Sequence, residues 1–501
     1  MMNYYLGLDN GGTLVKAVLF DQNGRMVNRA SEKLTMLTPA PGFTERDMDE
    51  LWAANVRVLR TAVEKAGPEI AAQIKSVACS GHGKGLYLWG KDQRPAYRGI
   101  VSTDARAVDF ADRFNSDGTI EKTFATNFQQ ILASQPVSIL RWLQDHEPHV
   151  LANTQWIFEC KDYIRFRLTG EAFAEITDYS GSNLLNLRER RFDQDLMATF
   201  GLGDLYRALP PLKHSTDICG FVTPEVAAQT GLPTGIPVAG GMFDIDACAI
   251  AMDILSDDKF CVIAGTWSIN GFISRQPVND HSVMMNSIYA LPDYYFIEES
   301  SPTSAGNHEW FIERFMSEEK QLAETRGISV YRLTDEMAAS VAPKDHDIIF
   351  LPYIYGSNYN PRAKACLIGL DSSHTRSQII RAVMEGICLG HRVHLEKLLA
   401  HKKPRVIRLA GGAANSPFWV QLFADIFQLP VETLESSELG ALGCAMAASV
   451  ADGQYQDLAA ASRAMVRVSQ RYEPQIELAD LYERKYKRFR QFSEQLDALW
   501  E

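Results

Sequence analysis

Short apolar runs alternate along the chain with longer segments in which apolar residues recur at helical spacing. Residues 4–8 and 15–20 form two such runs on either side of a polar turn, residues 51–65 carry a helical pattern, and residues 74–79 form a third run. Apolar runs bounded by turn residues are typical of buried strands, and their alternation with amphipathic helices is typical of a sheet covered by helices. The pattern therefore predicts an α/β protein.

The same alternation continues through the rest of the chain. Gly170 follows a helical segment as a stop signal, and Pro417 and Pro430 bracket another. The further elements that the pattern predicts are helices at 138–142, 162–168, 418–427 and 439–451, strands at 156–158, 260–264, 269–273 and 406–410, and a turn-rich region at 200–237.

Length and composition narrow the class of protein. The 501 residues exceed the roughly 250–300 that one hydrophobic core holds, so two domains are expected. A net charge of −12 argues against nucleic acid or an anionic membrane as a partner. The first residues lack a signal-peptide pattern, and segment 439–451 is shorter than the ~20 residues of a membrane helix, so we expect a cytoplasmic protein. The eight cysteines form no C-x-x-C pair, which predicts free thiols.

The turn between the first two runs, Asp9 to Thr13, has the composition of a phosphate-binding hairpin. Its glycines, Gly11 and Gly12, would allow a positive φ and a close approach of backbone N–H groups to an anion, while Thr13 and Lys16 add a hydroxyl and a cation. Asp9 is placed to hold hydrated Mg²⁺. The alternative is an ordinary type I′ hairpin, for which Asn-Gly is a common signal.

A second hairpin repeats this design about half a chain later. An apolar run at 260–264 leads into Gly265-Thr266, and a further run follows at 269–273. The repeat predicts duplicated domains whose hairpins face each other across a cleft, although coincidence is the alternative.

A third glycine site, Gly411-Gly412, lies between a predicted strand and a predicted helix. Asn415 or Ser416 can cap that helix, whose unpaired N–H groups and positive dipole end suit a nucleotide. Many α/β proteins carry such a loop without a ligand, so this alternative stays open.

Two carboxylates follow another strand and glycine turn at Gly240-Gly241. Asp244 or Asp246, at the head of an apolar helix, could serve as a general base or only as a helix N-cap.

Together these motifs resemble the FGGY family of carbohydrate kinases, in order along most of the chain. The resemblance implies an actin-like, ribonuclease H-like ATPase fold with two domains, 1–247 and 248–501, each a mixed sheet flanked by helices. The motifs that carry it are Gly7 to Thr13 with Lys16 and Phe20-Asp21, Lys161-Asp162-Tyr163 ending in Leu168-Thr169-Gly170, Gly265 to Ser268, Gly369 to Gly386, and Gly411-Gly412 with Asn415, Gln421, Ala424 and Asp425.

The resemblance also implies roles for individual residues. It selects Asp244 as the base, because Ala247 completes the family's Asp-x-x-Ala element, and a carboxylate with an ordinary pKa near ~3.9 would be ionised at neutral pH. The co-substrate would be ATP and the metal Mg²⁺ at Asp9. The implied ATP- and phosphate-binding residues are Gly11, Gly12, Thr13, Lys16, Gly265, Thr266, Gly306, Gly411, Gly412 and Asn415, and the implied sugar-binding residues are His82, Lys84, Asp104 and Asp244.

One departure from the family pattern bears on the sugar. Gly83 and Lys84 stand where the family often has Met-His, which would make room and add a cation. Segments 82–86, 104–106, 301–310 and 351–358 most resemble L-xylulose and 3-keto-L-gulonate kinases, which implies a small ketose phosphorylated at a terminal hydroxyl. Kinases of D-xylulose, L-ribulose or glycerol are alternatives, and an actin-like ATPase without sugar kinase activity is a remote one. Whether the chain forms a homodimer is left open.

Overall fold

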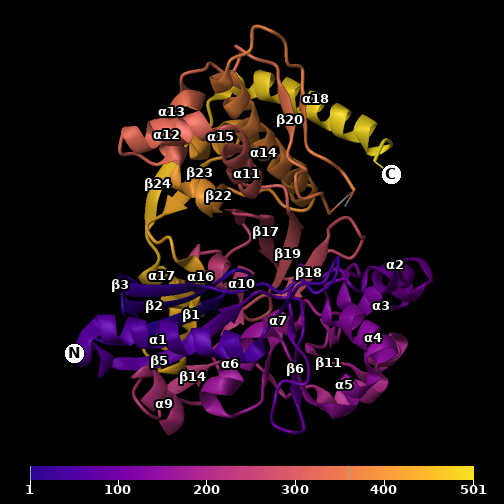
Figure 1. Ribbon diagram of the computed structural model, residues 1–501, viewed down its shortest axis with the longest axis vertical. Coiled ribbons are helices and arrows are strands. Elements are labelled where there is room, and N and C mark those ends of the chain that lie inside the picture. Colours follow the sequence, from indigo (N-terminus) through magenta and orange to yellow (C-terminus); the bar gives the residue numbers. More distant parts are fainter. Residues whose placement is uncertain (1, 359, 361, 501) are drawn as a thin grey trace. The chain divides into compact units, whose positions relative to one another are not determined.

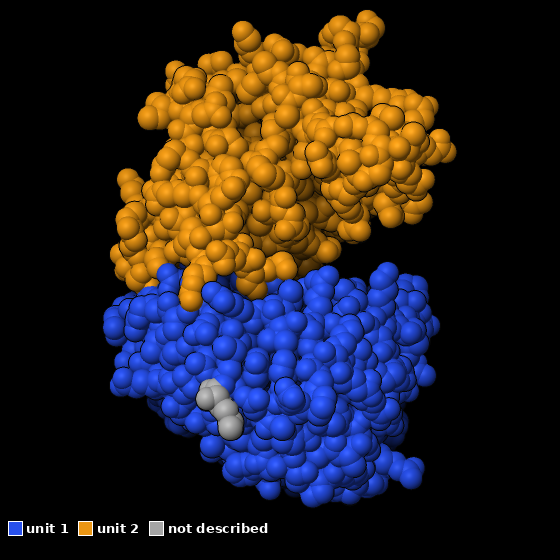
Figure 2. All heavy atoms as spheres, turned by 90° about the vertical axis from the view of Figure 1, so that its left-hand side faces the viewer, with its two compact units in different colours: residues 1–255, 273–297, 438–466 blue, residues 256–272, 298–437, 467–501 orange. Residues whose placement is uncertain are grey.

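The computed structural model describes residues 2–358, 360 and 362–500. The chain forms two compact units, which Figure 2 colours separately. Unit 1 comprises residues 1–255, 273–297 and 438–466, and unit 2 comprises residues 256–272, 298–437 and 467–501. The chain therefore crosses between the units several times, whereas the sequence motifs predict a single boundary after residue 247.

A mixed sheet forms the centre of unit 1, in the strand order β13-β14-β5-β1-β2-β3. Strand β1 pairs antiparallel with β2 and parallel with β5, and β14 pairs parallel with β5. The predicted first hairpin is confirmed. The strands are β1 (Tyr4–Asn10), β2 (Leu14–Asp21), β3 (Met26–Lys33), β5 (Ile74–Gly81), β13 (Ile218–Phe221) and β14 (Pro237–Ala239), with β15 (Met242–Phe243) also paired to β5.

A second sheet, most of which belongs to unit 2, repeats this arrangement. Its neighbouring strands follow the order β19-β17-β16-β22-β23-β24, and β16 pairs antiparallel with β17 and parallel with β22, as β1 does with β2 and β5. The predicted repeat of the hairpin is therefore confirmed in the pairing of the strands around it. The strands are β16 (Lys259–Ala264), β17 (Ser268–Ser274), β19 (Tyr295–Ser301), β22 (Val406–Ala410), β23 (Val431–Leu434) and β24 (Val468–Tyr472).

Helices cover the sheet of unit 1. Helix α1 (Met48–Ala71) runs along β2 and β3 (Figure 1) and begins where the Asp47 side chain accepts hydrogen bonds from two backbone N–H groups. A φ of 77° at Gly67 interrupts its helical backbone before Pro68. Helix α6 (Cys160–Thr169) ends at Gly170 as predicted, and this glycine adopts the left-handed conformation. Helix α16 (Leu439–Ala451) packs on β1, β5 and α10 (Asp244–Ala251).

In unit 2, Figure 1 shows α11, α14 and α15 grouped beside β22 and β23. Helix α15 (Pro417–Phe427) begins as predicted, with Ser416 as its N-cap accepting from the N–H of Trp419. The other helices named below are α11 (Gly306–Phe315), α13 (Val330–Ala339), α14 (Arg376–Leu399) and α18 (Ala479–Asp497).

Shorter elements connect these layers. Within the described residues, no helix combines the length and the apolar character that crossing a membrane requires. One more strand, β18 (Met285–Ile288), pairs with β19 at the edge of the second sheet. The connecting strands are β4 (Glu45–Arg46), β6 (Tyr87–Gly90), β7 (Gly99–Ile100), β8 (Thr154–Phe158), β9 (Ala174–Glu175), β10 (Leu185–Asn186), β11 (Arg191–Phe192), β12 (Leu212–Lys213), β20 (Ile349–Leu351) and β21 (Cys366–Ile368), and the connecting helices are α2 (Val108–Ser116), α3 (Thr119–Asn127), α4 (Pro136–His146), α5 (Pro148–Asn153), α7 (Ile176–Tyr179), α8 (Gln194–Thr199), α9 (Pro224–Thr230), α12 (Ser317–Thr325) and α17 (Leu458–Met465).

Candidate functional site

The hairpin between β1 and β2 presents unpaired backbone donors. Gly11 donates its N–H to the carbonyl of Leu14, at 3.0 Å, but among the described residues the N–H groups of Gly12 and Thr13 have no acceptor. Neither glycine adopts a left-handed φ, so the expected positive φ is wrong and a type I′ turn is not formed. A Cβ on Gly12 would meet nothing within 4 Å, so what the glycine supplies is open space for a ligand.

Asp9 lies at the end of β1 and is partly accessible. Its Oδ1 accepts a hydrogen bond from the Ser80 hydroxyl at 2.9 Å. Burial raises the pKa of this carboxyl, and the charge of Lys16 partly offsets the rise. Lys16 itself donates to Glu438 at 2.8 Å. Asp9 is therefore a carboxylate of limited solvation beside the unpaired amides of the hairpin, a setting in which a cation would be stabilised.

The two candidate bases have different surroundings. Asp246 is completely buried and accepts from the N–H of Ala290 at 2.9 Å, whereas Asp244, the first residue of α10, is partly accessible. The N-cap of this helix is Phe243, so neither carboxylate acts as the cap. Accessibility therefore favours Asp244 as the group that meets a substrate.

The expectation of an ordinary pKa for Asp244 is wrong. Burial raises its pKa well above the usual value, the nearby charges of Asp9 and Asp178 raise it further, and the positive charge of Lys84 opposes them. A base with a raised pKa accepts a proton more readily from a weakly acidic hydroxyl.

A glycine turn fixes the chain just before this base. Gly241 has a φ of 75°, and a Cβ there would lie 1.9 Å from the carbonyl oxygen of Cys79 on β5. Only glycine can occupy this position without moving the strand, so the sheet backbone sets where α10 begins.

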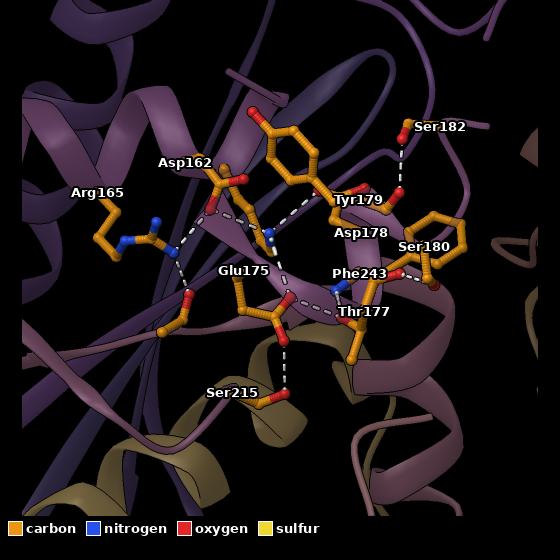
Figure 3. A network of polar contacts seen from close by, with 12 residues as sticks. Asp162, Arg165, Glu175, Thr177, Asp178, Tyr179, Ser180, Ser182, Ser215 and Phe243 are labelled. Atoms are coloured by element: carbon orange, nitrogen blue, oxygen red, sulfur yellow. Dashed lines mark hydrogen bonds and ion pairs between the residues drawn. The ribbon is translucent and has the colours of Figure 1, made fainter. Parts of the chain in front are cut away.

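A buried charge network is centred on Lys161, the lysine of the Lys-Asp-Tyr motif, and Figure 3 shows its carboxylates Asp162, Glu175 and Asp178. The ammonium group of Lys161 lies 3.2 Å from Asp162, 3.3 Å from Glu175 and 3.2 Å from Asp178, and all four side chains are fully buried. Burial raises the pKa of Asp178 to about 7.

Two side chains join the network to the backbone before the base. Arg165, which pairs with Asp162 at 2.7 Å, donates to the carbonyl of Gly240 at 2.6 Å. Thr177 donates to Glu175 at 2.7 Å and accepts from the N–H of Phe243 at 2.9 Å, one residue before Asp244. Ser215 donates to the other oxygen of Glu175 at 2.8 Å, and Figure 3 shows it on the side of that carboxylate away from Thr177. The sequence motif at 161–163 therefore anchors the backbone that carries the base.

The loop after β5 carries the predicted sugar-binding residues. His82 is buried, donates its backbone N–H to Asn10 and contacts the Tyr87 hydroxyl through Nε2, at 3.0 and 2.8 Å. Burial lowers the pKa of His82 to about 3, so the ring is neutral. A Cβ on Gly83 would lie 2.5 Å from the ring of Phe243, so this aromatic ring fills the space that the glycine was expected to leave open.

Asp104 lies in a separate cluster. Its Oδ1 accepts from the backbone N–H and Nε of Arg106 at 3.0 and 2.9 Å, and its Oδ2 accepts from Thr44 N and Arg106 Nη2 at 2.7 and 2.9 Å. A carboxylate offers about four lone-pair sites, so protein donors use all of them here and none is left for a sugar hydroxyl.

A pocket of about 830 Å³ in unit 2 gathers most of the nucleotide-binding residues that the sequence analysis names for this half. They come from the turn after β16, the start of α11 and the loop before α15. Gly411 adjoins the pocket with a φ of 88°, and a Cβ there would lie 2.5 Å from the carbonyl of Ala264. The predicted residues in the lining are Gly265, Thr266, Gly306, Gly412 and Asn415.

A buried histidine joins two of the segments that line this pocket. His391 on α14 contacts Ser268 and Asn270 through Nδ1, at 3.1 and 2.9 Å, and Ser304 through Nε2, at 2.7 Å. Burial lowers its pKa to about 3, so the ring is neutral and, with Nδ1 donating to Asn270, Nε2 accepts from Ser304.

Sequence reasoning missed two groups of residues. Tyr331 and Asp335 of α13 line the pocket of unit 2, but their helix carries no motif. Arg46, beside the N-cap of α1, donates to the carbonyl of Gly12. In the sequence, the only local signal for Arg46 is its position directly before Asp47, the residue that caps α1.

Comparisons with known proteins agree with these observations. Residues 4–251 match the FGGY family of carbohydrate kinases, N-terminal domain, and residues 260–451 match the C-terminal domain of the same family. The chain is 34% identical over 501 residues to the probable L-xylulose kinase of Pasteurella multocida, with 99% of this chain and 100% of the relative covered. It is 34% identical over 492 residues to the L-xylulose/3-keto-L-gulonate kinase of Escherichia coli, with 98% and 96% covered.

A solved structure shares the fold. The gluconate kinase of Lactobacillus acidophilus superimposes with a TM-score of 0.90 at 23% identity, over 100% of this chain and 99% of that one. The predicted two-domain, actin-like α/β fold of sugar kinases is therefore confirmed. On the family matches to both of its halves, the chain belongs to the FGGY family of carbohydrate kinases.

Proposed function

We propose that this sugar kinase transfers the γ-phosphoryl group of ATP to a terminal hydroxyl of a small ketose, with L-xylulose as the first candidate and 3-keto-L-gulonate as the second. The observation that carries the proposal is a partly accessible Asp244 with a raised pKa, beside Asp9 and next to the loop of His82 and Lys84. The names of the two relatives, both 34% identical, support the choice of sugars.

In this proposal Asp244 removes the proton of the sugar hydroxyl while that oxygen bonds to the γ-phosphorus. The bond from this phosphorus to the oxygen bridging to the β-phosphate breaks, and ADP leaves with the electron pair. A positioned base of this kind contributes about 10²- to 10⁴-fold in rate. The remainder comes from orientation and from neutralisation of the charged transition state.

The hairpin supplies donors for that charge. The unpaired N–H groups of Gly12 and Thr13 bind phosphate oxygens, and the pocket of unit 2 takes the adenosine and the remaining phosphates, with Thr266 at its phosphate end and Asn415 and Tyr331 among its other walls. Lys16, which donates to Glu438 in this structure, is proposed to contribute its charge rather than a direct contact.

Asp9 fits the proposed Mg²⁺. Magnesium in kinases binds through one or two carboxylates together with substrate phosphates and water. Asp9 has a partly accessible carboxylate whose pKa is raised chiefly by burial, so a cation beside it would relieve the cost of its charge. Mg²⁺ would supply neutralisation of the phosphate charge.

Lys84 is the residue proposed to read the sugar. Its φ of 65° is rare outside glycine and is held by the surrounding fold, and its charge acts on Asp244 and on buried Glu159. A cation so placed would favour a substrate with a carboxylate. Lys84→Met should therefore raise KM for 3-keto-L-gulonate more than for L-xylulose, and equal changes would remove Lys84 from acid recognition.

The test of the function is a coupled assay of ADP production with Mg²⁺-ATP and one sugar at a time: L-xylulose, 3-keto-L-gulonate, D-xylulose, L-ribulose and glycerol. We expect the highest kcat/KM for L-xylulose and at least a ~100-fold loss of kcat in Asp244→Asn, the lower end of what a positioned base contributes. A higher kcat/KM for another sugar would identify that sugar as the substrate in place of L-xylulose. ADP production that no sugar stimulates would refute the kinase reaction. The expected compartment is the cytoplasm, and size-exclusion chromatography with light scattering would decide between monomer and dimer.

A further inference from the structure

Arg46 is a buried cation without a counter-charge. It lies on β4, directly before the N-cap of α1, and is 2% exposed. Its Nη2 donates to the carbonyl of Gly12 at 2.6 Å, while Nε and Nη1 have no acceptor among the described residues. No carboxylate of the described residues lies within salt-bridge distance of it. By contrast, buried Arg106 pairs with Glu45 and Asp104, at 2.7 and 2.9 Å, and buried Arg165 pairs with Asp162 at 2.7 Å.

An arrangement of this kind is unfavourable unless an anion completes it. Burying an ionised group is strongly unfavourable when nothing of opposite charge pairs with it. Proteins keep such groups where a ligand supplies the missing charge, and buried polar donors without partners are otherwise rare. Arg46 therefore points to an anion that arrives with the substrates.

The hydrogen bond that the Arg46 side chain donates to Gly12 also orients the hairpin. Because the peptide group is planar and trans, the carbonyl of Gly12 and the N–H of Thr13 point in opposite directions. Arg46 holds the carbonyl on one side of the hairpin, so the Thr13 N–H points to the other, where it has no acceptor. The hairpin is thus held with an amide donor exposed.

Arg46 contacts the phosphate hairpin and acts electrostatically on the sugar loop. Its charge is, after burial, the largest cause of the lowered pKa of His82, and His82 in turn donates its N–H to Asn10 of the hairpin strand, at 3.0 Å. The guanidinium therefore contacts the hairpin and acts on the sugar loop, the two segments between which a phosphoryl group would pass.

We propose that Arg46 is a phosphate-site residue of this kinase: it fixes the Gly12–Thr13 peptide with its N–H outward and supplies the positive charge that stabilises the transferred phosphoryl group. The inference rests on the proposed function, which names that group. The ligand class is the terminal phosphate of a nucleoside triphosphate, so Arg46 should distinguish ATP from ADP.

The experiment compares two variants. Arg46→Gln removes the positive charge, and Arg46→Lys keeps the charge but replaces the planar guanidinium group with an ammonium group. Arg57→Gln is the matched control, because Arg57 lies on the adjoining helix and forms exposed ion pairs with Glu32 and Glu50. Binding of Mg²⁺-ADP and of its non-hydrolysable triphosphate analogue AMP-PNP is measured by calorimetry, and kcat and both KM values by the coupled assay.

We expect Arg46→Gln to weaken the binding of AMP-PNP at least ~10-fold more than the binding of ADP. It should also lower kcat by about 10²- to 10³-fold, the size of the loss when one hydrogen-bond donor to a transition state is removed. Arg46→Lys should retain part of the preference for AMP-PNP over ADP and part of kcat, and Arg57→Gln should change neither quantity. Equal weakening of the two nucleotides, or a change confined to the KM of the sugar, would overturn the inference.

Two further comparisons keep the tests separate. Should Arg46→Gln fail to fold, the ratio of AMP-PNP to ADP affinity in Arg46→Lys decides the same question. If the wild-type protein produced no sugar-dependent ADP, the proposed function would fail, while the nucleotide-binding comparison would still decide the role of Arg46.

Discussion

Thr177→Val tests how the buried Lys161 network holds the backbone that carries Asp244, because the hydroxyl of Thr177 joins Glu175 of that network to the N–H of Phe243. Valine keeps the shape of threonine and removes only the hydroxyl. The change deletes the 2.7 Å hydrogen bond to Glu175 and leaves the N–H of Phe243, a residue that is 5% exposed, without its 2.9 Å acceptor.

The size of the effect follows from those two losses. A hydrogen bond to a charged group contributes about 1.5–3 kcal/mol, and an unpaired buried N–H costs about 1–3 kcal/mol, so Thr177→Val should lower the free energy of unfolding by about 2.5–6 kcal/mol. A shift of about 1 Å in a reacting group can lower the rate about 100-fold. We therefore expect kcat to fall about 10- to 100-fold, with KM for ATP within about twofold of wild type.

Ser215→Ala is the matched control. It deletes the 2.8 Å hydrogen bond to the other oxygen of Glu175 and should cost about 1.5–3 kcal/mol of stability, but it leaves Thr177 and Phe243 joined. Thr177→Ser keeps the hydroxyl and should restore kcat. Unfolding is followed by urea titration and kcat by the coupled ADP assay, well below the melting temperature of every variant. If Thr177→Val and Ser215→Ala lowered kcat equally, or if serine failed to restore it, the hydroxyl would not position the base.

Three other changes test the surroundings of the site. Asp178→Asn removes a negative charge that raises the pKa of Asp244, so the acidic limb of kcat/KM should move to lower pH; an unmoved limb in a pH–rate profile would contradict this coupling. Gly83→Ala would place a Cβ 2.5 Å from the ring of Phe243 and should lower kcat/KM for the sugar at least ~10-fold with the KM for ATP unchanged. His391→Phe should raise the KM for ATP about 10-fold but not that for the sugar, because it removes the imidazole that joins Ser268 to Ser304 beside the pocket of unit 2; steady-state kinetics with each substrate varied in turn would reveal any other pattern.

Local patterns were sufficient for most elements of the fold. The apolar runs at 4–8, 15–20 and 406–410 became β1, β2 and β22, because a buried strand needs an unbroken apolar face. Ser416 and Gly170 also act where their chemistry placed them, at a helix start and a helix end. Information of this kind lies within a few residues of the element and can be read without knowing the fold.

What the patterns missed depends on contacts between distant segments. Nothing near Asp244 in the sequence indicates the raised pKa, which comes from burial and from Asp9 and Asp178, 235 and 66 residues away in the numbering of the chain. Gly83 has no neighbour in sequence that would fill its space, yet the ring of Phe243 does so. Composition reveals which residues can do the chemistry, but the electrostatic setting appears only when the sheet brings them together.

The start of α16 shows how far this dependence extends. The sequence predicts only a buried helix at 439–451, yet a Cβ on Gly440 would lie 3.0 Å from Asp9 Oδ2, and a Cβ on Gly7 would lie 1.9 Å from the carbonyl oxygen of Ala441. The first turn of this helix therefore packs directly on the strand that carries Asp9, with no side chain between the two backbones. Glu438, the residue directly before this helix, carries a negative charge that raises the pKa of Asp9 and so adds to the effect of burial. The proposed metal carboxylate of the N-terminal hairpin is thus tuned by the start of a helix encoded more than 400 residues later, which explains why the hairpin alone is indistinguishable from an ordinary turn in the sequence.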